Sequence, residues 1–351
     1  MIRFIWRRLT YGFLVIVGVV LVVFFLFHAL PGDPVSMMVG QRTDISTRQA
    51  ITKELGLDQP LPKQLFHYVR DLSPISIHKN TEENKLKYEY YPVLELGKEV
   101  LVVKKPYLRR SFQTNKRVDE ILWKNLGNTF WLALAAIIFA STIGISFGII
   151  AALKQNTFWD HFLVSGSVLG ISIPSFVSGI IIAMIFGYYL SDYTGLSLTG
   201  QLWVTNAFTG RELHLENIIL PAFTLGIRPL SIIVQLTRSS MLDVLSQDYI
   251  RTARAKGLRF YKVIIKHALK NALNPVITAV SGWLASLMAG AFFVEYIFDW
   301  KGLGYVTINA VQSLDFPVVM GATLLIAVIF VIVNIAVDIL YAAIDPRVRL
   351  G

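Results

Sequence analysis

The sequence predicts an all-α polytopic membrane protein with six transmembrane helices, and three observations support this class. Of the 351 residues, 54% are hydrophobic and only 16% are charged, whereas a soluble domain carries about 25% charged residues. The apolar residues are gathered into runs of about 20 residues or more, the length that a helix needs to cross a bilayer. Most Lys and Arg residues lie at the ends of these runs and in one loop, where positive charge orients membrane helices.

The composition argues against several classes of function. The chain has no cysteine, which excludes disulfides, thiolate metal sites and a cysteine nucleophile. Its net charge of +10 belongs to span ends and one loop, so we expect no nucleic-acid partner. The histidines are dispersed without ligand spacing, and neither a GxxxxGKS/T phosphate loop nor a GxSxG motif occurs. We therefore expect no metal site, no catalytic residue and no ATP hydrolysis in this chain.

The first apolar run covers residues 9–30 and follows three arginines. It is too long for the core of a secretory signal, and no small-residue cleavage site precedes Pro31. We therefore expect residues 1–30 to remain as the first transmembrane helix, with the arginines and the N-terminus in the cytoplasm.

Residues 31–124 are predicted to form one long segment on the far side of the membrane. Within it, residues 41–55 and 63–72 have the pattern of helices, and the stretch VLELGKEVLVV predicts a small hairpin that turns near Gly97. We expect an extracytoplasmic α+β insertion between the first two transmembrane helices. Residues 75–106 either contact a substrate-delivering protein or form a solvated elaboration, and the sequence leaves both open.

Residues 125–345 are expected to hold the other five transmembrane helices. These helices are expected at 128–153, 161–190, 217–241, 274–298 and 318–344. The loop 242–270 is strongly basic, since the chain from Arg238 to Lys270 has eight Lys or Arg residues and two acidic ones. Six crossings place this loop, both termini and the tail at 346–351 in the cytoplasm.

Polar residues and helix breaks inside the spans are candidates for lining a translocation pathway. Pro174 interrupts the third span and removes a backbone donor, which a bilayer tolerates only where the break is packed in protein or faces water. A simple packed kink is the alternative. The pathway candidates are Ser172, Pro174, Ser175, Arg228, Ser281, Ser286 and Asn334.

Arg228 lies near the middle of the fourth span. An arginine at the centre of a membrane helix costs about 2.5–3.5 kcal/mol, so it should face a partner or water rather than lipid. It could attract the carboxylate of a peptide. The alternative is a structural ion pair with Asp338 or a contact with a helix carbonyl.

A short helix is predicted inside the basic loop, from Asp248 to Gly257. Asp248 can cap its N-terminus, and Gly257 fits a C-terminal stop. Tyr249, Ile250 and Ala253 share one side at spacings of three and four. We expect this small apolar face, rimmed by arginines, to dock into a cleft of another protein. The alternative is an ordinary positive-inside loop.

Two stretches of this region, YIRTARAKG at 249–257 and HALKNALNPV at 267–276, carry a family resemblance. They resemble the cytoplasmic loop of ABC-importer permeases, specifically the first permease of the dipeptide, oligopeptide and nickel uptake group. The resemblance covers nearly the whole chain, and includes HALPGDP at 28–34 and LGLDQPLPKQ at 55–64.

The general pattern of these importers is Glu-Ala-Ala, three residues, then Gly. In this sequence Arg251 and Thr252 replace the Glu and the first Ala, whereas Ala253 and Gly257 agree with the pattern. In the family, this loop holds a coupling helix that sits in a cleft of the ATPase subunit. The resemblance assigns ATPase coupling to Asp248, Tyr249, Arg251, Thr252, Ala253, Arg254, Ala255, Lys256 and Gly257.

The resemblance also implies the type I ABC importer permease fold and ATP-driven import of di- or oligopeptides across the inner membrane. The implied partners are a second homologous permease, two ATPase subunits that bind ATP and Mg, a solute-binding protein outside the membrane, and the lipid bilayer. This chain would be non-catalytic and would carry no cofactor. Nickel or another small solute is the alternative cargo, because nickel permeases share these motifs.

Two other classes fit the sequence less well. An ion-coupled secondary transporter would need buried acidic residues and an internal inverted repeat. Only Asp338 lies near the interior of a span, and the sequence has no visible repeat. A membrane-embedded enzyme would need a catalytic constellation, and the sequence contains none.

Overall fold

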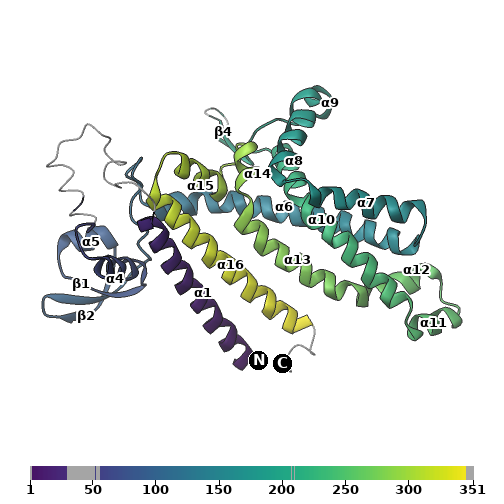
Figure 1. Ribbon diagram of the computed structural model, residues 1–351, viewed down its shortest axis with the longest axis horizontal. Coiled ribbons are helices and arrows are strands. Elements are labelled where there is room, and N and C mark those ends of the chain that lie inside the picture. Colours follow the sequence, from purple (N-terminus) through teal and green to yellow (C-terminus); the bar gives the residue numbers. More distant parts are fainter. Residues whose placement is uncertain (1, 30–51, 53–55, 207, 209, 345–351) are drawn as a thin grey trace. The chain divides into compact units, whose positions relative to one another are not determined.

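The computed structural model describes residues 2–29, 52, 56–206, 208 and 210–344, and long apolar helices dominate it (Figure 1). Among these residues, five helices are long and apolar enough to cross a membrane. They are α1 (Ile2–Ala29), α6 (Val118–Leu153), α10 (Glu216–Leu245), the continuous run of α12 (Phe260–Lys262), η2 (Val263–Leu269) and α13 (Lys270–Gly290), and α16 (Phe316–Ile344). Apart from Thr52, the helix expected at 41–55 lies outside the described residues, as does the tail at 346–351.

The third expected span, 161–190, is a sharply bent pair of helices rather than one interrupted rod. It consists of α7 (Phe158–Ser172) and α8 (Ser175–Ile182), which continues into the π-helix η1 (Ala183–Tyr189), and the bend measures 106°. Ile173 is extended there (φ −95°, ψ 130°), because a residue before proline disfavours the helical conformation. Six crossings, as the sequence predicts, result when this pair counts as one span.

The helix that contains most of the fifth expected span begins and ends earlier than the predicted span itself. It starts at Phe260 instead of 274 and stops at Gly290 instead of 298. Lys262, Lys266 and Lys270 look like loop residues in the sequence, but their spacing of four puts them on one exposed side of this helix. Two short helices, α14 (Phe292–Ile297) and α15 (Leu303–Gln312), then lead to α16.

Close packing around α10 explains several glycines in the spans. A Cβ added to Gly144 of α6 would lie 2.8 Å from the side chain of Ile233 on α10. Gly170 allows α7 a similarly close approach to Ile227 of α10. Small residues let membrane helices approach at backbone distance. The largest apolar core lies next to these contacts, among α6, α10, α13 and α14, and contains the buried rings of Phe298 and Trp300.

The segment between α1 and α6 contains a small α+β fold (Figure 1). Its elements are α4 (Leu61–Leu72), β1 (Ile75–Lys79), α5 (Glu82–Tyr88), β2 (Tyr91–Leu96) and β3 (Glu99–Val103). The strands form an antiparallel sheet in the order β1-β3-β2. The expected hairpin is present as β2 and β3, and it turns at Gly97, whose φ is +70°. The sequence analysis missed β1, which pairs Ile77 with Leu101.

A second hairpin lies in the connection between η1 and α10, which the sequence analysis treated as a loop. Its strands are β4 (Trp203–Asn206) and β5 (Gly210–Leu213), and the short helix α9 (Ser191–Thr194) precedes them. The hairpin pairs Trp203 with Leu213.

The chain divides into two compact units. One contains Met1–Gly12, Asn125–Ile308 and Ile329–Gly351, and the other contains Phe13–Lys124 and Asn309–Val328. Within the second unit, Asp315 accepts hydrogen bonds from the hydroxyl of Ser111 (2.5 Å) and the backbone N–H of Phe112 (3.0 Å). All the candidate site residues belong to the first unit.

Candidate functional site

The short helix expected from Asp248 to Gly257 is present as α11 (Asp248–Ala255), directly after α10. Gln247 precedes it in an extended conformation, and no side chain caps its first turn. Asp248 is therefore the first helical residue and not the cap that the sequence predicted. Its carboxylate lies 3.4 Å from the guanidinium of Arg251. Because both side chains are exposed, this ion pair adds little stability.

The helix ends where the sequence predicted, at Gly257. This residue has a φ of +73°, which glycine adopts without the strain that other residues incur. The N–H of Gly257 donates to the carbonyl of Arg254 (2.9 Å), and the N–H of Leu258 donates to the carbonyl of Ala253 (3.4 Å). These are the two bonds of a Schellman motif. No atom lies within 4 Å of a Cβ built on Gly257, so a side chain there would strain the backbone without a collision.

The apolar face of α11 packs on this chain itself, which corrects our expectation that it docks into another protein. Ile250 is 1% exposed and Ala253 is 7% exposed. Both belong to an apolar core that also contains Met241 of α10 and Val263 and Ile264 of η2. Since interiors of this kind are closely packed, α11 is joined firmly to the end of the fourth span and the start of the fifth.

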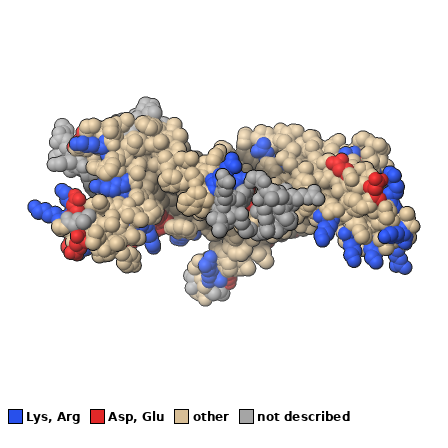
Figure 2. Space-filling view, turned by 90° about the horizontal axis from the view of Figure 1, so that it is seen from below, with Lys and Arg blue, Asp and Glu red and all other residues tan. Residues whose placement is uncertain are grey.

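The opposite face of α11 is exposed, polar and basic. Its exposed residues are Arg251, Thr252, Arg254, Ala255 and Lys256. Tyr249 is also exposed, and its hydroxyl accepts a hydrogen bond from the side-chain amide of Asn271 at 2.9 Å. Arg259 and Lys262 extend the charge beyond the helix. Figure 2 shows Lys and Arg side chains gathered at the right, where α11 and α12 lie in Figure 1.

A bidentate ion pair fixes the C-terminal part of α10 to α7. Arg238 donates to both carboxylate oxygens of Asp160, at 2.5 and 2.6 Å. The backbone N–H of Asn156 donates to the same carboxylate at 2.9 Å. The side chain of Asp160 is 2% exposed and that of Arg238 is 27% exposed. Sequence reasoning missed this pair because its members are far apart in the chain, although an arginine inside a span signals that a partner exists.

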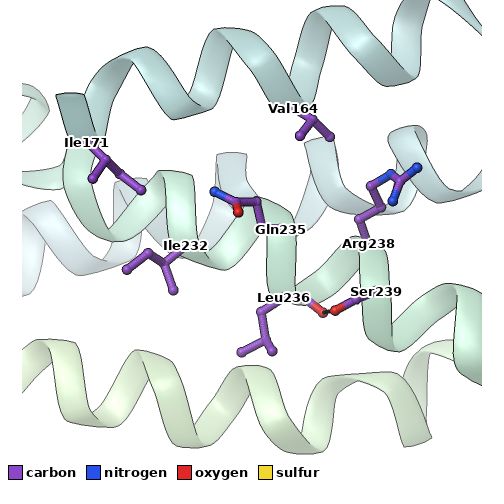
Figure 3. A pocket seen from close by; sticks show the side chains of 7 residues that line it. All are labelled: Val164, Ile171, Ile232, Gln235, Leu236, Arg238 and Ser239. Carbon is purple, nitrogen blue, oxygen red and sulfur yellow. Dashed lines mark hydrogen bonds between the residues drawn. The ribbon is translucent and has the colours of Figure 1, made fainter.

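A groove of about 520 Å³ runs between α7 and α10 (Figure 3). It is lined by Val164 and Ile171 of α7 and by Ile232, Gln235, Leu236, Arg238 and Ser239 of α10. Its walls are mainly aliphatic, and Gln235 and Ser239 add polar groups from one side of α10. The sequence signal for this groove is the spacing of four between these two polar residues on an apolar helix.

The seven expected pathway residues are spread over α7, α8, α10, α13 and α16, and none of them lines this groove. Ser172, Pro174, Arg228 and Ser286 are exposed, whereas Ser175, Ser281 and Asn334 are half-buried. The Ser281 hydroxyl donates to the carbonyl of Ile277 and the Asn334 amide donates to that of Phe330. The role of these residues in a pathway stays a prediction.

The structural ion pair that we considered for Arg228 does not form. Asp338 on α16 pairs instead with Arg8 on α1, whose Nε lies 3.0 Å from the carboxylate. Arg228 is exposed on α10 and forms no hydrogen bond or ion pair with any residue that the structure describes. Neither alternative partner, the Asp338 carboxylate or a helix carbonyl, is therefore used.

A buried carboxylate that the sequence analysis did not single out holds the turn between α14 and α15. Glu295 is fully buried and accepts hydrogen bonds from the Thr129 hydroxyl (2.7 Å) and from the N–H groups of Gly304 (2.7 Å) and Tyr305 (3.1 Å). These N–H groups belong to the first turn of α15, where a carboxylate is favoured. A Cβ on Gly302 would lie 2.5 Å from the carboxylate carbon of Glu295, so a residue with a side chain does not fit there. The signal in the sequence is therefore Glu295 with Gly-x-Gly seven residues later, at 302–304.

Two models of known protein families match this chain. The family model described as "Binding-protein-dependent transport system inner membrane component" matches residues 144–350, which include α11, the groove and Arg228. The model for the N-terminal part of such components matches residues 1–133. The chain belongs to this family. It is a permease of an ABC importer, and thus a multi-pass inner-membrane protein.

The permease is similar along its whole length to known permeases. It is 36% identical to the dipeptide transport system permease protein DppB of Escherichia coli (strain K12), over 99% of both chains. It is also 36% identical to the di/tripeptide transport system permease protein DppB of Pseudomonas aeruginosa (strain UCBPP-PA14), over 99% of both chains. The dipeptide permease DppB of Alkalihalophilus pseudofirmus is 33% identical over 99% of this chain and 100% of its own length.

A solved structure supports the fold. A chain of the inward-facing MetNI methionine ABC transporter resembles the permease with a TM-score of 0.51 and 17% sequence identity, over 64% of this chain and 96% of that one. The permease therefore has the type I ABC importer permease fold that the sequence resemblance predicted.

Proposed function

We propose that this permease is a subunit of an ATP-driven importer of di- and oligopeptides, and that it forms half of the translocation pathway. One observation carries the proposal. The chain is 36% identical, over 99% of its length, to permeases named for dipeptide and for di/tripeptide transport. The identity extends across the coupling loop, the spans and the connections between them, so it supports a shared cargo class as well as a shared fold.

The proposed assembly contains a second homologous permease, two ATPase subunits and an extracytoplasmic solute-binding protein. The ATPase subunits would bind ATP and Mg, and this chain would contribute no catalytic residue. The termini and α11 would face the cytoplasm, and the α+β segment from α4 to β3 would lie on the other side. The basic exposed face of α11 supports this orientation, since Lys and Arg are enriched in cytoplasmic loops.

The proposed coupling surface is the exposed face of α11. Arg251, Thr252, Arg254, Ala255 and Lys256 would contact the ATPase, with Asp248 and Tyr249 beside them. Ala253 and Gly257 would act from within, because one anchors the helix in its apolar core and the other ends it. A helix held this rigidly transmits a push to the fourth and fifth spans as a rigid-body movement.

The proposed passage opens when these spans move against the second permease. Polar or helix-breaking residues of the spans would line it. They are Ser172, Pro174, Ser175, Arg228, Ser281, Ser286 and Asn334. Their exposure or partial exposure in the single chain supports this assignment.

Transport by the assembled complex tests the cargo. The two permeases and two ATPases, reconstituted in liposomes with the solute-binding protein outside and MgATP at the ATPases, should accumulate a labelled dipeptide. Nickel, offered in place of the dipeptide, should not accumulate. Accumulation of nickel without the dipeptide would contradict the proposed cargo.

The Gly257→Val variant tests the coupling role. A β-branched residue in the left-handed region costs about 1–2 kcal/mol, so the Schellman motif should open and α11 should lose its fixed end. We expect ATP hydrolysis to continue while dipeptide uptake per ATP falls. Gly210→Val is the matched control, because Gly210 also has a positive φ (+83°) with no atom near its Cβ position, but lies in the β4–β5 hairpin. An unchanged uptake per ATP in Gly257→Val, at normal expression, would contradict the role.

A further inference from the structure

No side chain among the described residues neutralises the charge of Arg228, which lies in the middle of a membrane span. Arg228 is the thirteenth of the 30 residues of α10, and apolar residues surround it in the sequence. Two acidic side chains of the described helices are already engaged, because Asp160 binds Arg238 and Asp338 binds Arg8. Glu295 is bound by Thr129 and by two backbone N–H groups. The structure thus leaves Arg228 available to an anion from outside the described chain.

One face of α10 continues from Arg228 as a line of accessible residues. Ile232, Gln235 and Ser239 follow at four, seven and eleven residues, and they therefore share its side of the helix. Gln235 and Ser239 are exposed, and Ile232 is half-buried. At 1.5 Å per residue, the line from Arg228 to Ser239 is about 16 Å long. An extended peptide covers that length with about four or five residues.

The groove between α7 and α10 lies along this line (Figure 3). Ile232 is at the end of the groove opposite Arg238 and Ser239, so Arg228 lies one helical turn beyond that end. Arg238 at one end of the groove and Arg228 beyond the other end differ in whether their guanidinium can bind a ligand. Arg238 gives its guanidinium to Asp160, which leaves Arg228 as the cation that can receive a ligand. The volume of about 520 Å³ is in the range of small-molecule sites.

We propose that Arg228 binds the C-terminal carboxylate of the transported peptide, while the peptide lies along the groove between α7 and α10. The inference rests on the proposed peptide cargo. A free carboxylate is the anionic group that di- and oligopeptides share whatever their side chains, and a guanidinium binds it with two parallel hydrogen bonds. The aliphatic wall formed by Val164, Ile171 and Ile232 accepts varied side chains, and Gln235 and Ser239 offer hydrogen bonds to the peptide backbone.

Thiol labelling tests this subsite, because this chain has no cysteine and a single introduced one is then its sole thiol, whose label is read on this subunit after the subunits are separated. In the reconstituted transporter, Arg228→Cys and Gln235→Cys should react with a membrane-impermeant charged thiosulfonate. A saturating dipeptide should slow the reaction of Gln235→Cys, where Arg228 is intact, and the same dipeptide with a C-terminal amide should slow it less. In Arg228→Cys the guanidinium is gone, so the dipeptide and its amide should protect equally weakly. Phe223→Cys is the matched control. This exposed position lies on nearly the opposite side of α10, and the dipeptide should not protect it.

Uptake gives a second readout. A hydrogen-bonded charge pair lost in Arg228→Gln should slow dipeptide uptake about tenfold or more, while Arg228→Lys should retain most of it. Stimulation of ATP hydrolysis by the solute-binding protein should persist in both variants. Absence of labelling at Arg228→Cys, or labelling at Gln235→Cys that the dipeptide does not slow or that its C-terminal amide slows equally, would overturn the subsite while the wild-type complex still imports dipeptides. A wild-type complex that imports no dipeptide would overturn the proposed cargo and the subsite with it.

Discussion

The two arginines of α10 lie in opposite surroundings. Arg238, near the C-terminal end, is held by both oxygens of the buried Asp160 carboxylate. Arg228, in the middle, binds no residue that the structure describes. An arginine in a span is costly unless it has a partner or faces water. The first charge therefore holds the end of α10 that leads into α11 against α7, and the second is the one that we propose to bind the transported peptide.

The largest effect on stability is expected from Asp160→Asn. It leaves the guanidinium of Arg238 without its counter-charge, and breaking a buried ion pair costs about 3–5 kcal/mol. Because Arg238 is 27% exposed, we expect the lower end of that range. Thermal unfolding of the purified complex in detergent measures it.

The double variant Asp160→Leu with Arg238→Met provides the control. Replacing both members of a buried pair by apolar residues is often neutral or stabilising, so this variant should recover most of the loss. An equal loss in the single and double variants would show that the site depends on shape and not on charge.

The next largest effect on stability is expected in the apolar core on which α11 packs. Ile250→Ala removes a fully buried side chain from the core beneath the helix, and such truncations cost about 2–5 kcal/mol, less where the site can collapse. The matched change on the exposed face, Arg254→Ala, should leave stability within about 0.5 kcal/mol. It should nevertheless weaken co-purification of the ATPase. Equal loss of stability in the two variants would contradict the assignment of an inner and an outer face.

Arg228→Gln should have almost no effect on stability, in contrast to Asp160→Asn. No described residue loses a hydrogen bond or an ion pair, so the change should stay within about 0.5 kcal/mol. The same variant is expected to slow transport. A destabilisation as large as that of Asp160→Asn would remove the distinction between the two arginines.

A smaller, pH-dependent effect is expected in the α+β segment, where a buried base stays neutral. Burial first, and then the charges of Arg70 and Lys104, lower the pKa of His78 to about 4. The unfolded chain takes up this proton below about pH 6.5, so the stability that neutral His78 confers is lost as the pH falls from about 6.5 to 4. His78→Gln should flatten that part of the pH profile of unfolding. An unchanged profile would contradict the lowered pKa of His78.

The sequence predicted the features that depend on local pattern. Apolar runs predicted the five helices that are long enough to cross a membrane and the bent pair of α7 with α8, and Gly97 and Gly257 located two turns because each needs a positive φ. The 106° bend at Pro174 was not predictable, since a proline marks a break but the packing of neighbours sets its angle. The early start of the fifth span's helix at Phe260 was not predicted, because three lysines at helical spacing look like a loop when their common side is not recognised.

The candidate site was likewise predictable only where it depends on local sequence pattern. The apolar face of α11 was visible in the sequence, but amphipathicity shows only that one face is buried and not whether its own chain or a partner buries it. The pair of Asp160 with Arg238 and the bonds of Glu295 to Thr129 join residues far apart in the chain. Single-sequence patterns do not carry such pairings.

The most direct test of the coupling surface is cross-linking in the assembled transporter. A single cysteine at Arg254→Cys, on the exposed face of α11, should cross-link to an ATPase subunit through a short bifunctional thiol–amine reagent. Thr205→Cys, exposed on the β4–β5 hairpin, should not. A cross-link from Thr205→Cys to the ATPase with none from Arg254→Cys would contradict the account.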